Sequence, residues 1–331
     1  MAIDYDRFAR RVNQVGNNDR YLNNQAGMTK SMRKQFLLFS ISLLFIIVSS
    51  QMNLAQTFSF HDIEKLPQSQ ADHRIAYGND PLQFGDLRLP KSKGKHPIII
   101  VIHGGCWFAQ YDLTHLNSFC DALTRLGAAT WSLEYRRIGN DGGGFPGTFQ
   151  DVAQGADFLR ALAKKYPLDL NRVIVIGHSA GGQLALWLAA RKNLPRDSVL
   201  YVANPLPLNG VISLAGITDL RKYRPDCDDA VTKLLGGAPE QFAARYQQTS
   251  PIELLPVKIP IRLIHGVKDN IVPLELGKEF VATAKSKGEQ VTLTVLEDAG
   301  HFDLISPLAN DWAVIKNAVL TLLKSKTQGT R

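Results

Sequence analysis

The sequence predicts an α/β fold, with a mostly parallel sheet that is covered by helices on both faces. Short runs of β-branched residues, such as those at 97–102 and 173–176, are typical of buried strands. Stretches with helical character alternate with these runs, as at 149–165 and 183–190. Strands that alternate with helices form parallel sheets. With 45% apolar residues, the chain can also build a full core.

In the first half of the chain, two early antiparallel strands are expected at 75–78 and 83–90, with turns between them. The apolar run at 97–102 is too short for a helix and predicts a buried strand. A helix at 116–126, a strand at 129–133 and a glycine-rich loop at 141–147 follow. The amphipathic helix at 149–165 ends before Pro167, and the strand at 173–176 then leads into the helix at 183–190.

The second half continues the alternation. The pattern predicts strands at 210–216, 259–266 and 291–296, with helices at 274–287 and 308–323. Residues 217–256 are irregular, with several prolines and the pair Gly236-Gly237, and they predict a small cap insertion over the site. No internal repeat is visible, so we expect one domain over residues 56–331.

Two segments are expected before this domain. Residues 1–31 are polar and lack periodicity, which predicts a disordered or untranslated upstream extension, with Met32 as the initiator. Residues 32–55 have the organisation of a signal peptide: a basic start, an apolar run at 36–48 and a small residue at Ala55. Cleavage at 48–50 and an uncleaved anchor with a short cytoplasmic tail are alternatives. The interpretation predicts export, to the periplasm or the medium.

The net charge of +8 is scattered along the chain, without the dense basic blocks of a nucleic-acid binder. The three cysteines are Cys106, Cys120 and Cys227, and their spacing suits neither a disulfide framework nor zinc. We interpret them as buried free thiols, with a single disulfide as the alternative. No metal or cofactor site is therefore predicted.

The strand at 173–176 runs into Gly177-His178-Ser179-Ala180-Gly181, and a helix follows. A Gly-x-Ser-x-Gly turn between strand and helix exposes its serine as a nucleophile, and the glycines allow strand and helix to approach closely. The turn also places the Ala180 N–H at a helix N-terminus, where it can stabilise negative charge. The alternative is a turn that only packs or binds a phosphate. We take Ser179 as the candidate nucleophile.

A serine nucleophile needs a base, and the base needs an acid that orients it. Asp269 follows the strand at 259–266, and His301 follows the strand at 291–296. Because the carboxyl ends of parallel strands meet at one edge of the sheet, these residues are candidates for acid and base. Alternatively, Asp269 caps a helix or turn and His301 is structural. Asp298 and Asp303 are the second choices for the acid, since they lie very close to His301 in sequence.

The segment His103-Gly104-Gly105-Cys106-Trp107 directly follows the strand at 97–102. Glycines let a loop turn its N–H groups inward, as an oxyanion hole requires. We assign the donors to Gly105, Cys106 and Ala180, with Gly104 as a substitute for Cys106. The alternative is a glycine-rich loop without such donors. Trp107 is expected to pack under the loop rather than to line the acyl pocket.

Together these motifs resemble the α/β-hydrolase superfamily. The resemblance rests on five segments: His103-Gly104-Gly105-Cys106-Trp107, Glu134-Tyr135-Arg136-Arg137, Gly177-His178-Ser179-Ala180-Gly181-Gly182, His265-Gly266 with Asp269 and Val272-Pro273, and Gly300-His301-Phe302-Asp303. Over residues 70–325 the chain is similar to the carboxylesterase group that contains kynurenine formamidases and bifunctional feruloyl and acetyl xylan esterases. One departure is Cys106, which replaces the third glycine of the His-Gly-Gly-Gly lipase pattern.

Together with the signal peptide, the resemblance implies an exported serine esterase that acts on a small ester or amide through Ser179, His301 and Asp269, without cofactor or metal. An arylformamidase or amidase is the second hypothesis, although a signal peptide disfavours a cytosolic role in tryptophan degradation. A catalytically inactive hydrolase fold used for binding is the third. No nucleic-acid partner is expected, and a membrane partner only if the signal segment stays as an anchor.

Overall fold

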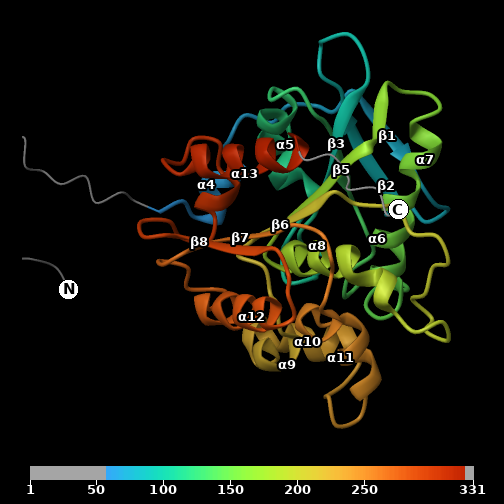
Figure 1. Ribbon diagram of the computed structural model, residues 1–331, viewed down its shortest axis with the longest axis vertical. Coiled ribbons are helices and arrows are strands. Elements are labelled where there is room, and N and C mark those ends of the chain that lie inside the picture. Colours follow the sequence, from blue (N-terminus) through green and yellow to red (C-terminus); the bar gives the residue numbers. More distant parts are fainter. Residues whose placement is uncertain (1–56, 325–331) are drawn as a thin grey trace, which may run out of the picture. The chain divides into compact units, whose positions relative to one another are not determined.

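An eight-stranded sheet runs through the computed structural model, which describes residues 57–324 (Figure 1). Across the sheet the strands follow the order β1-β2-β4-β3-β5-β6-β7-β8. Along the chain they are His73–Ala76 (β1), Phe84–Arg88 (β2), His96–Ile102 (β3), Ala129–Leu133 (β4), Leu168–His178 (β5), Gly210–Leu214 (β6), Ile261–Gly266 (β7) and Val291–Leu296 (β8). The β1–β2 and β2–β4 pairs are antiparallel, and all other neighbours are parallel. The predicted sheet is therefore confirmed.

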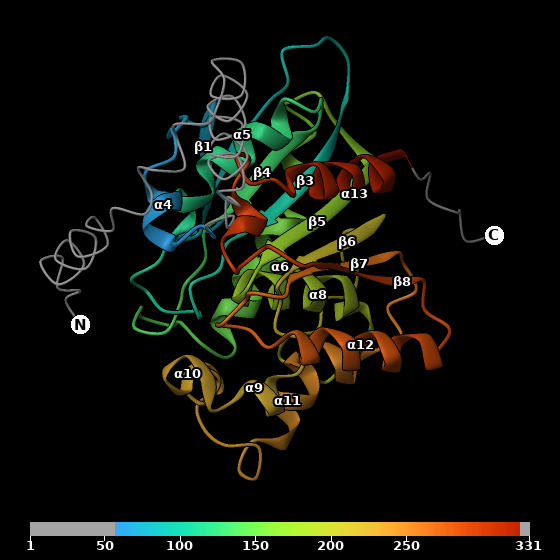
Figure 2. The same ribbon diagram turned by 90° about the vertical axis from the view of Figure 1, so that its left-hand side faces the viewer.

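Both faces of the sheet are buried, and successive side chains of each central strand point to opposite faces. In β3, Ile98, Ile100 and Ile102 belong to one core, whereas Ile99 and Val101 belong to the other. The first core is covered by Gly147–Asp157 (α6), Leu159–Leu162 (α7), Ala180–Ala190 (α8) and Leu274–Ser286 (α12), and the second by Asn117–Thr124 (α5) and Trp312–Lys324 (α13). Figure 2 shows these two layers on opposite sides of the strands.

Two predicted helices differ from the structure. The stretch at 149–165 forms two helices, α6 and α7, with Phe158 between them. The last helix begins at Trp312 instead of 308. Residues Asp303–Ile305 form a 3₁₀ turn (η4), and Pro307, which has no N–H, stands directly before the predicted start. An amphipathic pattern alone does not show such interruptions.

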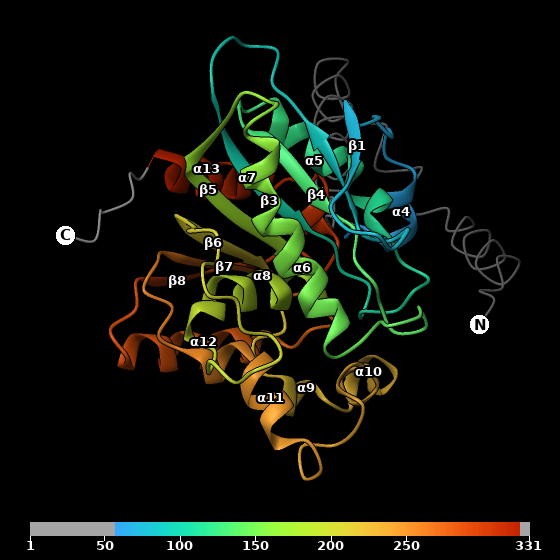
Figure 3. The same ribbon diagram turned by 90° about the vertical axis from the view of Figure 1, so that its right-hand side faces the viewer.

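The predicted cap, residues 217–256, is helical where the sequence predicted irregular structure. It contains Leu220–Tyr223 (α9), Asp226–Leu235 (α10), Ala243–Thr249 (α11) and the 3₁₀ turn Pro251–Leu254 (η3). Figures 2 and 3 show α9, α10 and α11 together on the side of the sheet that carries α6, α8 and α12. The Asp219 carboxylate caps α9 by accepting from the Arg221 and Lys222 amides. The first turn of α10 is not regular, because Cys227, Asp228 and Asp229 have positive φ of 55°, 55° and 53°.

Three further elements are short: Phe60–Glu64 (α4), Leu113–Leu116 (η1) and Arg191–Asn193 (η2). Ser59 caps α4 through a capping box with Asp62. Across residues 57–324, no helix combines the length and the apolar character needed to cross a bilayer. The predictions for residues 1–31 and 32–55 lie outside the described residues.

Candidate active site

Ser179 occupies the turn between β5 and α8 with φ 56° and ψ −123°. This is unusual for a residue with a Cβ, and such strained conformations cost on the order of 1–3 kcal/mol. A hydrogen bond and two closely packed glycines fix the turn. The Ser179 N–H donates to the Leu214 carbonyl of β6 at 2.9 Å, and a side chain at Gly177 or Gly181 would collide with nearby backbone. Sequence and packing therefore hold the serine at the carboxyl end of the sheet.

Asp269 and His301 meet at the same edge of the sheet, from the loops after β7 and β8. His301 Nδ1 lies 2.7 Å from Asp269 Oδ2, and Asp269 Oδ1 accepts the Ile271 and Val272 amides at 2.8 and 2.9 Å. Burial alone would raise the pKa of Asp269, but hydrogen bonds from His265 and His301, with the charge on His301, hold it well below its usual range. Asp269 is therefore an anion beside the His301 ring.

His178 brings His301 to the serine turn. The His178 Nε2–H donates to the His301 carbonyl at 2.9 Å, and the two ring centroids are 4.4 Å apart. Burial, and to a smaller extent the charge of the nearby His301, lowers the pKa of His178 well below its ordinary value. A neutral His178 thus links the residue before Ser179 to the backbone of the candidate base. His178 lies within the Gly-x-Ser-x-Gly motif, but its sequence position alone does not indicate this role.

His265 is a second residue that sequence reasoning missed. Its Nε2 donates to the Val272 carbonyl at 2.8 Å and lies 3.4 Å from Asp269 Oδ2. His265 thus lies beside the same carboxylate oxygen that faces His301, whereas the turn amides are on the other oxygen. Its position at the end of a strand, four residues before Asp269, was the available signal.

The two alternative acids lie elsewhere. Asp298 is exposed and pairs with Lys268 at 2.8 Å. Asp303 accepts the Gly300 amide at 2.9 Å and the Phe58 amide at 3.2 Å, and burial raises its pKa. Asp303 thus fixes the turn that carries His301, while the structure brings only Asp269 of the three carboxylates to the His301 ring.

The segment after β3, residues 103–107, is called the oxyanion loop below, and it packs directly on the serine turn. A Cβ built on Gly104 would lie 2.8 Å from the His178 carbonyl oxygen and 3.0 Å from Ser179 Cβ. Only glycine lets the loop come this close. The next three residues have positive φ, at 106° for Gly105, 50° for Cys106 and 57° for Trp107. Buried Trp107 donates its indole N–H to Gln183 Oε1 of α8 at 3.2 Å, as packing predicts.

A buried polar cluster, here called the loop anchor, holds the start of this loop and consists of His103, Glu134, Tyr135 and Arg137. Glu134 Oε1 lies 3.1 Å from His103 Nε2 and 2.6 Å from Arg137 Nη1. The Tyr135 hydroxyl donates to the His103 carbonyl at 2.7 Å. Burial alone would raise the pKa of Glu134, but His103, through its charge and hydrogen bond, and Arg137 hold it below its usual range.

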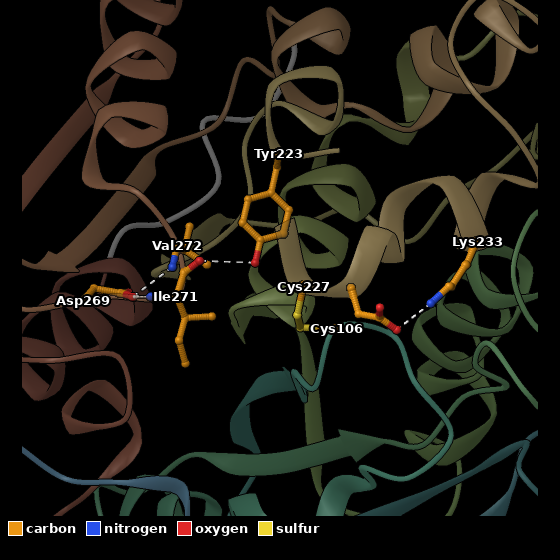
Figure 4. The surroundings of a disulfide bond; sticks show 8 residues. Cys106, Tyr223, Cys227, Lys233, Asp269, Ile271 and Val272 are labelled. Atoms are coloured by element: carbon orange, nitrogen blue, oxygen red, sulfur yellow. Dashed lines mark hydrogen bonds and ion pairs between the residues drawn. A yellow bond between two sulfur atoms is a disulfide. The ribbon is translucent and has the colours of Figure 1, made fainter. Parts of the chain in front are cut away.

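The prediction of free thiols was wrong for two of the three cysteines. Cys106 in the oxyanion loop and Cys227 in α10 form a disulfide with Cα atoms 6.3 Å apart (Figure 4). Cys120 is free and buried, as predicted. The two half-cystines are 121 residues apart, so their approach depends on where the cap folds, which spacing does not reveal. Beside them is a hollow of about 370 Å³, lined by Cys106, Phe108, Gln110, Tyr111, Cys227 and Asp228.

A larger hollow of about 670 Å³ lies next to α4 and η1, and Tyr111 lines both hollows. The Phe60 ring packs edge-on against Tyr111 at 5.4 Å and lies 5.7 Å from the Phe302 ring. Aromatic side chains thus lead from Tyr111, which lies close to Gly105 of the oxyanion loop, to Phe302 after His301. Within residues 57–324, no group of three or more His, Cys, Asp or Glu side chains is arranged to hold a metal ion.

Comparison with known proteins shows which family this chain belongs to. A family model described as BD-FAE matches residues 86–283, more than half of the chain. Esterase LipC of Mycobacterium tuberculosis is 27% identical over 74% of this chain and 64% of its own length. Isoprenylcysteine alpha-carbonyl methylesterase ICME of Arabidopsis thaliana is 25% identical over 71% of this chain and 57% of its own length. The chain thus spans less than two thirds of either relative.

Solved structures show the same fold. A truncated carbohydrate esterase from gut microbiota superposes with a TM-score of 0.67 at 21% identity, over 78% of this chain and 98% of its own. The tributyrin-phosphonate-inhibited esterase B from Lactobacillus rhamnosis gives 0.68 at 19% identity, over 87% of this chain and 94% of its own. With these neighbours and the observed sheet, the α/β-hydrolase fold is confirmed.

Proposed function

Since the chain belongs to the BD-FAE family, we propose that it is a carboxylic ester hydrolase of the serine type. The observation that carries the proposal is the 2.7 Å bond between His301 Nδ1 and Asp269 Oδ2 beside the serine turn. Relatives named as esterases and methylesterases support ester bonds as the substrate class. Among the described residues, no feature favours the formamide or amide alternative.

In the proposed reaction, the Ser179 Oγ attacks the ester carbonyl carbon while His301 Nε2 accepts the hydroxyl proton. The carbonyl oxygen becomes an oxyanion. When the tetrahedral intermediate collapses, the bond to the alcohol oxygen breaks, and His301 returns the proton to that oxygen. Water then attacks the acyl-enzyme with the same base, which releases the carboxylate and restores the serine.

Three neighbours of these residues support the roles. The ionised Asp269 fixes the His301 ring and stabilises the imidazolium that forms. The backbone N–H groups of Gly105, Cys106 and Ala180 are the proposed oxyanion donors. The close approach of Gly104 to Ser179 and the start of α8 at Ala180 are consistent with this assignment.

Replacing the nucleophile tests the proposal. We expect Ser179→Ala to lower kcat for short p-nitrophenyl esters by about 10⁴- to 10⁶-fold, because the covalent route is lost. A fluorophosphonate should label the parent at Ser179 and leave this variant unlabelled. Ser286→Ala, at an exposed serine of α12, is the matched control and should keep full activity and labelling. Activity of Ser179→Ala within tenfold of the parent would exclude the mechanism, and an unlabelled parent would favour a binding role.

We also propose that the protein is exported through a signal peptide at residues 32–55. The disulfide supports this, because such bonds persist in oxidising compartments. N-terminal sequencing of the protein from its native host should find a mature start between Val48 and Thr57. A chain that retains residues 36–48 would instead support the uncleaved anchor.

A further inference from the structure

The disulfide joins the loop that faces the nucleophile to the cap. We propose that Cys227 is a positioning residue for the oxyanion hole: through the disulfide it holds Cys106 in the backbone conformation that presents the Cys106 N–H to the reacting carbonyl. This inference rests on the proposed function, because an oxyanion hole matters only if Ser179 attacks an ester.

The backbone of Cys106 needs such support. Its φ of 50° is in the left-handed region, which residues with a Cβ avoid because the Cβ crowds the following carbonyl oxygen. The residues on either side are held by other contacts: the Gly105 carbonyl accepts the Phe108 amide at 2.9 Å, and the Trp107 indole donates to Gln183. At Cys106 itself, the side chain is tied by the disulfide.

Cys227 lies in a short non-helical stretch of α10, with φ 55°, and the cap that carries it is attached to the body on both sides. Before Cys227, the Tyr223 hydroxyl donates to the Ile271 carbonyl at 3.3 Å, in the turn that carries Asp269 (Figure 4). After it, the Leu234 carbonyl accepts the Phe145 amide at 2.7 Å. The disulfide therefore transmits the position of the cap to the oxyanion loop.

The bond can be broken in the folded protein. Cys106 and Cys227 are both half-buried and line the 370 Å³ hollow, so a small dithiol can reach them. Dithiothreitol supplies two electrons and two protons, the S–S bond becomes two thiols, and the reagent closes to its cyclic disulfide. Cys120 is a suitable control cysteine, since burial raises its pKa to about 11 and it takes no part in the bond.

The first measurement compares Cys227→Ala with the parent on a short p-nitrophenyl ester. We expect kcat to fall about tenfold or more with KM within about threefold, because an oxyanion donor stabilises the transition state rather than the bound ester. Complete reduction of the folded parent should lower kcat equally, and reoxidation should restore it. Thiols titrated after unfolding should rise from one to three per chain. Cys120→Ala should respond to reduction as the parent does.

The second measurement is a rescue. Glycine adopts positive φ without steric cost, so the double variant Cys106→Gly/Cys227→Ala should recover most of the lost kcat and be insensitive to dithiothreitol. A disulfide that served only to stabilise the fold or to tether the cap would not be replaced by glycine in this way. The double variant also keeps the test valid if Cys227→Ala alone does not fold.

Three outcomes would overturn the inference. These are a fully reduced parent with unchanged kcat, a folded Cys227→Ala with unchanged kcat, and a double variant that stays as slow as the reduced parent. Fluorophosphonate labelling separates the inference from the function. A parent that does not label at Ser179 rejects both, whereas a labelled parent whose kcat ignores reduction rejects the positioning role alone.

Discussion

The two oxygens of Asp269 have different partners. Oδ1 accepts two backbone amides of its own turn, and Oδ2 faces His301 at 2.7 Å and His265 at 3.4 Å. The turn therefore fixes the carboxylate independently of the histidines. With its pKa held well below the usual range, Asp269 stays ionised at any pH at which an imidazole base is neutral.

Removing this charge should impair the proposed reaction while the shape is retained. We expect Asp269→Asn to lower kcat about 10⁴-fold, because the amide no longer stabilises the imidazolium or selects the productive tautomer. Steady-state kinetics, with near-ultraviolet circular dichroism to verify folding, measures the effect. Asp298→Asn, at an exposed residue, is the control and should stay within about twofold of the parent. A larger loss in Asp298→Asn or Asp303→Asn than in Asp269→Asn would assign the acid elsewhere.

Sequence reasoning identifies those functional candidates that directly follow a predicted strand. Ser179, Asp269 and His301 each follow a strand of the parallel part of the sheet, so the sheet predicts that they share an edge. His178, His265 and Cys227 could not be given roles in the same way. His178 bonds to a carbonyl 123 residues away, and His265 bonds to a turn that forms only on folding. Cys227 pairs with a cysteine on another element.

The loop anchor directly follows the ends of β3 and β4, and all of its members are buried. The Glu134 carboxylate pairs with His103 and Arg137 and also accepts the Leu113 and Tyr135 amides, all with almost no exposure to solvent. Removal of the Glu134 carboxylate would leave the charge of Arg137 without its partner in the core.

We therefore expect Glu134→Ala to lower the free energy of unfolding at pH 7 by about 3–5 kcal/mol, measured by urea denaturation. Glu275→Ala is the control: it removes an exposed carboxylate paired with Lys278 and should cost at most about 1 kcal/mol. Equal costs for the two variants would mean that the loop anchor is not a buried ion-pair cluster.

The same carboxylate gives a pH dependence with a defined sign. Its pKa is lower in the folded chain than in the unfolded one, so the stabilisation is complete above the unfolded pKa of roughly 4.3. It is lost as the pH falls through the folded value. The difference in unfolding free energy between the parent and Glu134→Gln should therefore narrow below about pH 4. A difference that stays constant from pH 7 to pH 3.5 would contradict this.

Sequence reasoning is most accurate for elements with one dominant pattern. The strands β3 and β8 occur where they were predicted. For β3 the reason is burial on both faces, which leaves few alternatives for such a segment, whereas β8 is a partly exposed edge strand. The cap was predicted as an insertion but not as helices, since α9 and α11 are short and depend on tertiary packing and on caps such as Asp219. The break at Phe158 has no proline or glycine at that position to announce it.

For the whole molecule, the disulfide has a consequence for stability. Closing a segment of 121 residues restricts the unfolded chain, which chain-entropy estimates value at roughly 5 kcal/mol for a ring of this size. The kinetics of reduced and oxidised protein should therefore be compared at a temperature well below the lower of their two melting temperatures. Under those conditions a change in kcat reports the oxyanion loop rather than unfolding.

The same bond closes residues 106–227 into a covalent ring. Ser179 lies inside this ring, whereas Asp269 and His301 lie in the part of the chain that follows it. A single cut inside the ring linearises it without separating any part of the protein. The exposed Arg196, in the loop after η2, is a suitable site for brief trypsin treatment. Cleavage there should leave one species on a non-reducing gel and two polypeptides after reductant is added. Two polypeptides without reductant would show that the ring is open in solution.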